Sequence, residues 1–496
     1  MNKPSEARQD TINIIILAAI ALAIGVYLIA TTILINKDAV VYIEQTKNFP
    51  GHPSLFARGP YPPGYPFLIY VSHGIVTLIS NSVSVEAWIY SAQSVSLLCR
   101  VLSLIPLYFI GKSLVGARNS YFALLILIFL PYPAEYGSEV VREWPHLLFL
   151  ATAFFFLTRA SIGGDWRMFA ATGLFAGIGY AIRPECAQIV LYGILWLLVG
   201  LFIPRPRINR LKAFCLIFIL IIGFLIPAVP YSVIRGRVLP TKLKVIISSN
   251  NIQPERIEKP ACLASVMPRD ILIAVRKFTE RIGENLMYFF IPPLIIGLYY
   301  HFRKPKEFPA DGRLFISALI ILYIAMMMLL HINFGYISRR HFMPMIVFTA
   351  FYIPTGLFII ADWISGINIK ENANRQKNTQ KWFFILLTAG ILICTVKLSS
   401  PMGTEKKVYR QAAKWLKENT ASADIIAVPD LRISFYAERK GVLNWTHSSL
   451  AAKIKYVVQT AKESGDSEEK LLSGMSEVWS WPISKKGEAI LIYERK

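Results

Sequence analysis

The first long apolar run of the chain, residues 11–35 with the sequence TINIIILAAIALAIGVYLIATTILI, contains no charged residue. A helix of about 20 apolar residues is long enough to cross the roughly 30 Å hydrocarbon core of a membrane. The run follows a short polar leader and lacks the small-residue cleavage site of a signal peptide, so we expect it to remain as a membrane span. It therefore predicts an integral membrane protein.

Comparable apolar runs continue along the first four fifths of the chain. Hydrophobic residues make up 54% of the sequence and charged residues only 17%, whereas soluble domains have about a quarter charged residues. We therefore expect an all-α polytopic membrane protein, which excludes a soluble enzyme and a protein with a single anchor. The runs predict about 11 transmembrane helices, at residues 11–35, 86–110, 120–133, 145–161, 167–184, 186–203, 212–231, 285–301, 314–331, 342–363 and 381–398.

The apolar segment 66–80 is short, begins in a proline-rich stretch and contains His73. If it crossed the membrane, every later loop would change sides, and the lysines and arginines of the short loops would gather outside, against the usual bias. We therefore predict an interfacial or re-entrant helix here, a cytoplasmic amino terminus and an outer carboxyl-terminal region. The net charge of +22 is explained by this bias and by anionic lipid, not by nucleic acid.

The sequence changes character near residue 400, where charge becomes dense and hydrophobic residues become periodic. We expect a transmembrane catalytic domain at 1–400 and a small α/β extracytoplasmic domain at 401–496. The hydrophobic pattern of the second domain predicts helices at 406–418 and 449–461 and strands at 424–428 and 488–493.

The unusual polar residues gather on the outer face of this topology. Asp38 follows the first span and would share a helical face with Tyr42, and Arg58 and Tyr61 lie in the same outer loop. Ionisable groups at membrane depth are costly to keep, so they indicate a functional site. The other candidates come from later outer segments: Glu135, Glu139, Arg142, Glu143, Arg183, Glu185, Arg339, Arg340 and His341.

Most of these candidates also have a purely structural interpretation. Asp38 lies where interface residues are common. Glu143 precedes Trp144-Pro145, which predicts a helix start, where the helix dipole alone favours an acid. Arg183 and Glu185 would form a local ion pair at a helix end.

Two neighbouring arginines are harder to explain by structure alone. Arg339 and Arg340 lie on the outer face, which disfavours cations, and an anionic partner such as a lipid phosphate accounts for them. Glu143 and His146 are three residues apart on a predicted helix, which is only a weak metal-binding signal.

Several segments resemble, in the same order, those of the polytopic GT-C glycosyltransferases, which include bacterial relatives of the protein O-mannosyltransferases and the lipid A aminoarabinose transferase. The carboxyl-terminal region, with AKWLKENT at 413–420, is similar to the small outer domain of many such proteins. The other segments are DAVVYI at 38–43, YPPGYPFL at 61–68, RVLSL at 100–104, LYFIG at 107–111, SEVVREWPHLLF at 138–149, GIGYAIRPE at 177–185 and RHFMP at 340–344.

The resemblance implies a glycosyltransferase that moves a sugar, with inversion, from a polyprenyl-phosphate donor to an acceptor hydroxyl of a lipid, glycan or protein. It implies that Asp38 is the base and that either Glu143 or Glu139 is a second acid. The implied substrate-binding residues are Tyr42, Arg58, Tyr61, Arg183, Glu185, Arg339, Arg340 and His341. The positive charge for the donor phosphate would come from Arg339, from Arg340 or from a cation of the long outer loop at 232–284.

One departure from the family bears on metal use. Many relatives carry an Asp-Glu pair where this chain has Asp38-Ala39. No metal ligand or cofactor is therefore assigned, and only a divalent cation, Mg or Mn, stays open. The expected location is a bacterial inner membrane, with the site facing the periplasm or exterior.

Two other classes of protein also combine many spans with ionisable residues. A transporter or flippase of a lipid-linked glycan would place such residues near the bilayer midplane and on both faces, whereas here they gather on one face. A polysaccharide polymerase or ligase typically places its catalytic loop between late spans, whereas here the unusual residues lie in early outer loops. The residues therefore favour the glycosyltransferase.

Overall fold

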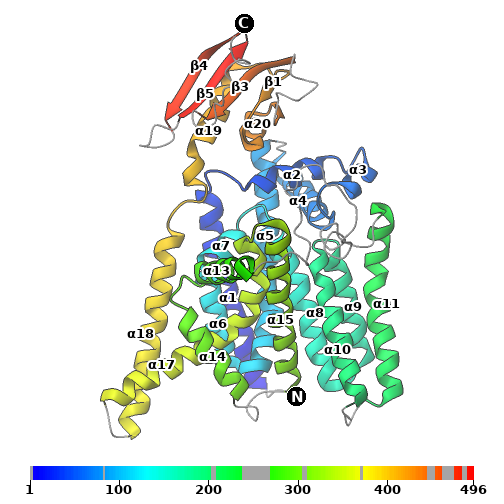
Figure 1. Ribbon diagram of the computed structural model, residues 1–496, viewed down its shortest axis with the longest axis vertical. Coiled ribbons are helices and arrows are strands. Elements are labelled where there is room, and N and C mark those ends of the chain that lie inside the picture. Colours follow the sequence, from blue (N-terminus) through cyan, green and yellow to red (C-terminus); the bar gives the residue numbers. More distant parts are fainter. Residues whose placement is uncertain are drawn as a thin grey trace.

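A computed structural model shows a bundle of long helices with a five-stranded sheet beyond one end (Figure 1). The amino terminus lies at the opposite end of the bundle from this sheet. The structure describes residues 4–81, 84–202, 208–236, 268–303, 310–368, 372–443, 453–460, 474–482 and 489–495.

The first half of the bundle contains α1 (Pro4–Thr31), α5 (Val85–Val115), α6 (Ala117–Phe129), α8 (Glu143–Gly163), α9 (Trp166–Tyr180), η1 (Pro184–Ala187), α10 (Gln188–Phe202) and α11 (Arg210–Arg235). The second half contains α13 (Pro268–Asn285), α14 (Ile291–Arg303), α15 (Ala310–Phe334), η3 (Arg339–Phe342), α16 (Met343–Thr349), η4 (Ala350–Tyr352), α17 (Ile353–Asn368) and α18 (Asn372–Leu398). The helices at the end of the bundle that faces the sheet are α2 (Lys37–Lys47), α3 (Pro53–Arg58), α4 (Gly64–Ser80) and α7 (Pro131–Tyr136).

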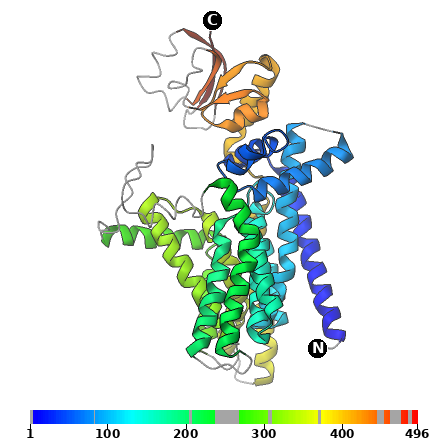
Figure 2. The ribbon, with the colours of Figure 1, turned by 90° about the vertical axis from the view of Figure 1, so that its right-hand side faces the viewer.

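The expected polytopic all-α class is confirmed. Eight helices of the described chain are long and apolar enough to cross a membrane, and a helix also occupies each remaining predicted span. Those remaining helices are short, since α6 and α14 have 13 residues each and α9 has 15. The segment predicted to be interfacial forms α4, which lies with α2 and α3 near the sheet rather than along the bundle (Figure 2).

Local signals fix the two helices that carry the main acidic candidates. The Asn36 side chain caps α2 by accepting a hydrogen bond of 3.2 Å from the backbone N–H of Asp38. Helix α8 begins at Glu143, as predicted, with Pro145 in its first turn, where a missing N–H costs nothing. Both acids therefore lie in first turns, which the helix dipole favours.

Glycines allow α9 and α11 to pack closely within the bundle. A Cβ atom at Gly173 would lie 2.3 Å from the carbonyl oxygen of Leu220, and one at Gly177 would lie 2.4 Å from that of Phe224. Small residues four apart are a common means of bringing membrane helices together. This contact sets the position of the α9 end, next to which Arg183 and Glu185 follow.

The carboxyl-terminal region consists of η5 (Thr404–Lys406), α19 (Lys407–Asn419) and α20 (Leu431–Ala437) packed with a sheet of strand order β2-β1-β3-β5-β4. Strand β1 is parallel to its neighbours β2 and β3, whereas β5 is antiparallel to β3 and β4. Trp415 of α19 packs against Trp479 of the sheet, with ring centroids 6.4 Å apart. The strands are β1 (Ile425–Ala427), β2 (Lys440–Val442), β3 (Ile454–Thr460), β4 (Met475–Pro482) and β5 (Ala489–Arg495).

The helix predicted at 449–461 is wrong, because its described part forms strand β3. Ile454, Tyr456, Val457 and Val458 are buried on both faces of this central strand. A strand buried on both faces shows a continuous apolar run rather than alternation, and its β-branched and aromatic residues were the better guide. The predicted helix at 406–418 and the strands at 424–428 and 488–493 are confirmed.

Candidate functional site

Asp38 meets Arg340 across 302 positions of sequence. One Asp38 carboxylate oxygen, Oδ2, lies 2.8 Å from Nη1 of Arg340, and both side chains are about a quarter exposed. Asp38 comes from the first turn of α2 and Arg340 from the short helix η3. The pair is therefore assembled by the tertiary fold and remains accessible.

Tyrosines form one wall beside this pair. The ring of Tyr42 lies 4.4 Å from that of Tyr61 and 5.1 Å from that of Tyr65, measured between centroids. Burial and the Asp38 carboxylate together raise the pKa of the Tyr61 hydroxyl, so it stays protonated and donates toward Asp38. The guanidinium of Arg142 covers the Tyr61 ring at 5.2 Å.

A second ionic cluster surrounds Arg183. Its Nη1 lies 3.4 Å from Glu143 and its Nη2 lies 3.3 Å from Glu185, so the expected local ion pair is present. Several buried polar atoms of this cluster have no hydrogen-bond partner among the described residues: Oε2 of Glu143, Nε of Arg183, Oε2 of Glu185 and both ring nitrogens of His146. Native proteins rarely leave such groups unsatisfied unless a ligand or water meets them.

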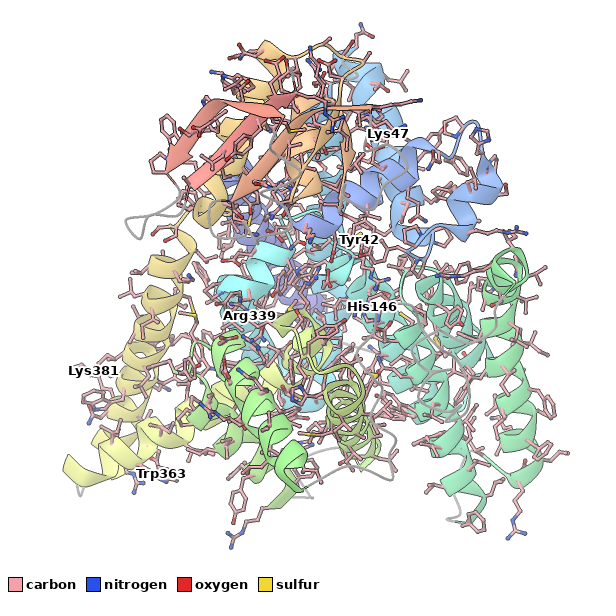
Figure 3. The ribbon with its side chains drawn as sticks, turned by 45° about the horizontal axis from the view of Figure 1, so that its top comes forward. Tyr42, Lys47, His146, Arg339, Trp363 and Lys381 are labelled. Carbon is pink, nitrogen blue, oxygen red and sulfur yellow. The ribbon has the colours of Figure 1, made fainter. Side chains whose placement is uncertain are left out.

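Glu143 connects the two clusters. Its carboxylate interacts electrostatically with Arg340 as well as bonding Arg183. Figure 3 shows the related side chains Tyr42, His146 and Arg339 in the middle of the molecule, well away from Trp363 and Lys381. The Arg340 and Arg183 clusters are therefore neighbours that share Glu143.

Glu139 occupies a different environment from Glu143. Its Oε2 accepts a 3.2 Å hydrogen bond from the side-chain amide of Asn36, the residue that caps α2. Burial, with the nearby Glu135 carboxylate acting in the same direction, raises the pKa of Glu139 to about 7. Glu139 therefore gains and loses its proton near neutral pH, and its bond to Asn36 supports the start of the Asp38 helix.

The adjacent arginines point to different partners. Arg339 lies over the ring of Tyr132 at 4.3 Å and 3.5 Å from Glu284, and it is more exposed than Arg340. Arg340 contacts Asp38, whereas Arg339 contacts Tyr132 and Glu284. The two arginines are therefore treated separately below.

Two other candidates contact parts of the structure outside this cluster. Arg58 donates to the carbonyl oxygen of Ile234 at the end of α11, 3.2 Å away. His341 uses its ring nitrogen Nδ1 to accept a hydrogen bond from the backbone N–H of Ser338, which closes the η3 turn. The long loop expected to hold further cations lies mostly outside the described residues, because 237–267 are not among them.

Sequence reasoning missed the part played by Asn36. The residue caps α2 and also bonds Glu139, so it joins two candidate acids. Asparagine directly before an amphipathic segment is a readable N-cap signal. Its second bond depends on tertiary structure and has no signal in the sequence.

The described residues contain no group of three or more His, Cys, Asp or Glu side chains arranged to hold a metal ion. Asp38 has Arg340 next to it, and Glu139 is bonded to Asn36.

Residues 62–231 match the model of the dolichyl-phosphate-mannose-protein mannosyltransferase family. The matched segment contains Glu139, Glu143 and Arg183, and it excludes Asp38 and Arg340. It spans about a third of the chain. No curated protein sequence matches the chain at a significant level.

Solved structures match over nearly the whole chain at low identity. ArnT from Cupriavidus metallidurans bound to undecaprenyl phosphate has a TM-score of 0.62 and 12% identity, and the match covers 97% of each chain. The apo state of ArnT has a TM-score of 0.61 at the same identity and coverage. The archaeal oligosaccharyltransferase AglB from Archaeoglobus fulgidus, in complex with an inhibitory peptide and a dolichol-phosphate, has a TM-score of 0.55 and 12% identity, covering 99% of this chain and 74% of AglB. The chain therefore shares the fold of ArnT and AglB, which agrees with the fold that its sequence motifs led us to expect.

Proposed function

We propose that the chain is a glycosyltransferase that uses a polyprenyl-phosphate sugar as donor and an acceptor hydroxyl on a lipid, glycan or protein. The observation that carries the proposal is the accessible Asp38–Arg340 pair beside a tyrosine wall and a cluster of unsatisfied polar groups. The fold adds support, because one ArnT structure of the same fold holds undecaprenyl phosphate.

In the proposed reaction, Asp38 accepts the proton of the acceptor hydroxyl. The hydroxyl oxygen then forms a bond to the anomeric carbon of the donor sugar, and the bond from that carbon to the phosphate oxygen breaks. The products are the glycosylated acceptor, polyprenyl phosphate and protonated Asp38. Because the oxygen attacks opposite to the leaving phosphate, the anomeric configuration inverts.

This geometry assigns different roles to Arg339 and Arg340. The base and the leaving group lie on opposite faces of the anomeric carbon, so a guanidinium 2.8 Å from Asp38 lies on the acceptor side. We assign Arg340 to orient the base. Arg339 has the more exposed side chain and becomes the candidate for the donor phosphate.

The two acids also receive separate roles in the proposal. Glu143 remains paired with Arg183, and its negative charge also stabilises the positive charge of Arg340. Glu139, which is neutral below about pH 7, supports Asn36 and so the helix of the base.

The described residues beside Asp38 do not form a divalent-cation site by themselves. The A. fulgidus oligosaccharyltransferase has been solved in complex with Zn and sulfate. In this chain, residue 39 is alanine, Glu139 is bonded to Asn36, Glu143 is bonded to Arg183, and Arg340 lies next to Asp38. The reaction above is therefore written with protein groups alone.

We infer that the site faces the periplasm or exterior of a bacterial inner membrane. The inference rests on the bias of short-loop lysines and arginines toward the end of the bundle that holds the amino terminus. Lys47→Cys and Ser480→Cys, probed on intact cells with an impermeant thiol reagent, should both react. Protection of either position would contradict this orientation.

The proposed activity is tested with the purified wild-type protein in lipid nanodiscs. A panel of labelled polyprenyl-phosphate sugars is offered with lipid, glycan and peptide acceptors, and protein-free nanodiscs serve as the blank. We expect one donor to release polyprenyl phosphate and glycosylated acceptor in equal amounts, with inverted configuration by NMR. Folded protein that transfers no sugar from any donor would contradict the proposal.

A further inference from the structure

The segment between α1 and α2 is held by the carboxyl-terminal region rather than by its own secondary structure. Residues 32–36 belong to neither helix. Buried backbone groups outside helices need partners from elsewhere. Here the partners come from residues about 370 to 400 positions later in the chain.

Ile35 is held by hydrogen bonds at both its backbone N–H and its carbonyl oxygen. Its N–H donates to the hydroxyl oxygen of Tyr436 at 3.3 Å, and its carbonyl oxygen accepts a 3.0 Å hydrogen bond from Nη1 of Arg432. Both partner side chains belong to α20 and are only 8% exposed. Only Asn36 and Lys37 lie between Ile35 and Asp38.

The side chains of Arg432 and Tyr436 are themselves held in place by neighbouring residues. Asp430 accepts two hydrogen bonds from the Arg432 guanidinium, at 3.0 and 2.7 Å, and also caps α20. The guanidinium of Arg410 lies over the Tyr436 ring at 3.7 Å and bonds Glu86 at the start of α5. Such a bidentate, packed arrangement leaves little freedom to the donors.

Two further contacts, nearer to α1, join the same segment to residues 402 and 403. The backbone N–H of Ile33 donates to the carbonyl oxygen of Met402 at 3.0 Å. Gly403 has φ +78°, and a Cβ atom there would lie 2.6 Å from the carbonyl oxygen of Leu34. The two segments therefore approach more closely than a larger residue would allow.

We propose that this clamp, defined as Arg432 and Tyr436 on Ile35, positions the base Asp38 for transfer. The path is short, because Ile35 precedes Asn36, which caps α2 and bonds Glu139, and Asp38 lies in the first turn of that helix. The proposal rests on the proposed function, and it makes Arg432 and Tyr436 positioning residues outside the reacting centre. In this way the carboxyl-terminal domain affects the rate of the chemical step by fixing the position of Asp38.

The test uses the full-length protein with Tyr436→Phe, which removes one hydroxyl and keeps the ring beneath Arg410. Misplacing a catalytic group by about 1 Å costs up to 10²-fold, and we expect kcat to fall by about 10-fold with the donor KM unchanged. Amide hydrogen exchange in the peptide covering 33–38 should become faster. Arg432→Lys should act in the same direction.

Arg439→Lys is the matched control. The hydrogen bonds of the Arg439 guanidinium stay within the carboxyl-terminal region, on Thr420, Lys417, Ala437 and Glu438. This variant perturbs the same domain without touching Ile35, so its kcat and its exchange at 33–38 should match the wild type. A fall in kcat equal to that of Tyr436→Phe would overturn the clamp.

A double mutant separates positioning from general damage. If the clamp acts through Asp38, adding Tyr436→Phe to Asp38→Asn should cause no further loss, because the group being positioned is already gone. Losses that multiply would overturn the proposal, as would faster exchange at 33–38 with unchanged kcat. If Asp38→Asn left turnover unchanged, that result would contradict the proposed function instead. Hydrogen exchange would still show whether the clamp holds the segment.

Discussion

The two ends of the helical bundle both contain buried ionic networks. We call a network closed when both oxygens of its buried carboxylate have partners, and open when buried polar atoms lack them; only one of the two is closed. At the end that holds the amino terminus, Lys112 lies 2.6 Å from Asp10 and 2.8 Å from Glu6. Tyr108 donates to the other Asp10 oxygen at 2.9 Å and accepts from Asn13 at 3.0 Å. This network satisfies both carboxylate oxygens of Asp10.

The network around Arg183 differs in this respect. Its ion pairs are longer, at 3.3 and 3.4 Å, and buried atoms of Glu143, His146, Arg183 and Glu185 lack partners among the described residues. Both networks cost desolvation energy, but among the described residues only the first gives each oxygen of its buried carboxylate a partner. We therefore propose that the first network stabilises the fold and that the second binds a substrate.

The largest expected effect separates the two arginines of the open end. Arg340→Ala should lower kcat by about 10², because the base loses the group that orients it. Arg339→Ala should instead raise the donor KM by roughly 10-fold with a smaller change in kcat, because it removes a phosphate contact. Steady-state kinetics with varied donor measure both. Equal changes in donor KM for the two variants would contradict the assigned division.

A smaller effect is expected at Arg183. Arg183→Lys keeps the charge, but a single ammonium cannot reach Glu143 and Glu185 with the geometry of a planar fork. We expect transfer to fall by about 10-fold while the melting temperature stays close to that of the wild type. A large loss of stability with normal turnover would make this cluster structural, like the network at Asp10.

The closed end should respond in the opposite way. Lys112→Met removes both ion pairs of the network and leaves Asp10 with Tyr108 alone. Leaving a buried charge poorly paired costs about 1–3 kcal/mol, so thermal stability should fall. Turnover per folded molecule should remain unchanged, and kinetics corrected for active fraction by a ligand-independent folding assay would measure it.

The smallest effect is a pH dependence from Glu139. Its pKa is raised from 4.5 to about 7 in the folded protein, so the folded state binds a proton more tightly than the unfolded chain. The wild type therefore loses stability as the pH rises from about 4.5 through 7. Glu139→Gln stays neutral and keeps an acceptor for Asn36.

The melting temperature of Glu139→Gln should match the wild type near pH 5 and exceed it near pH 8. Parallel thermal unfolding of both proteins at several pH values measures the difference. A difference that is the same at every pH would show that Glu139 does not titrate in this range.

Much of the fold could be predicted because its physical signals are local. Apolar runs of sufficient length indicate membrane helices wherever they occur, and Trp144-Pro145 after an acid indicates a helix start. The shared face of Asp38 and Tyr42 follows from helical periodicity once α2 is recognised. Strand β3 was missed because a central strand lacks the alternation that distinguishes strands from helices.

The site was less predictable, because its contacts join distant segments. Nothing in the sequence distinguishes Arg340 from Arg339, and the choice of Asp38 as partner depends on how η3 packs near α2. The same holds for Asn36 on Glu139 and for the clamp on Ile35. Composition and spacing identified which residues were unusual, whereas packing decided which of them meet.

The most direct test of the account compares one aspartate from each end of the bundle. Asp38→Asn and Asp10→Asn are each close in shape to the original residue, and turnover at saturating donor and melting temperature are measured for both. We expect Asp38→Asn to lose roughly 10² or more in turnover at an unchanged melting temperature, and Asp10→Asn to show the reverse. Near-wild-type turnover of Asp38→Asn would contradict the central claim that Asp38 is the base.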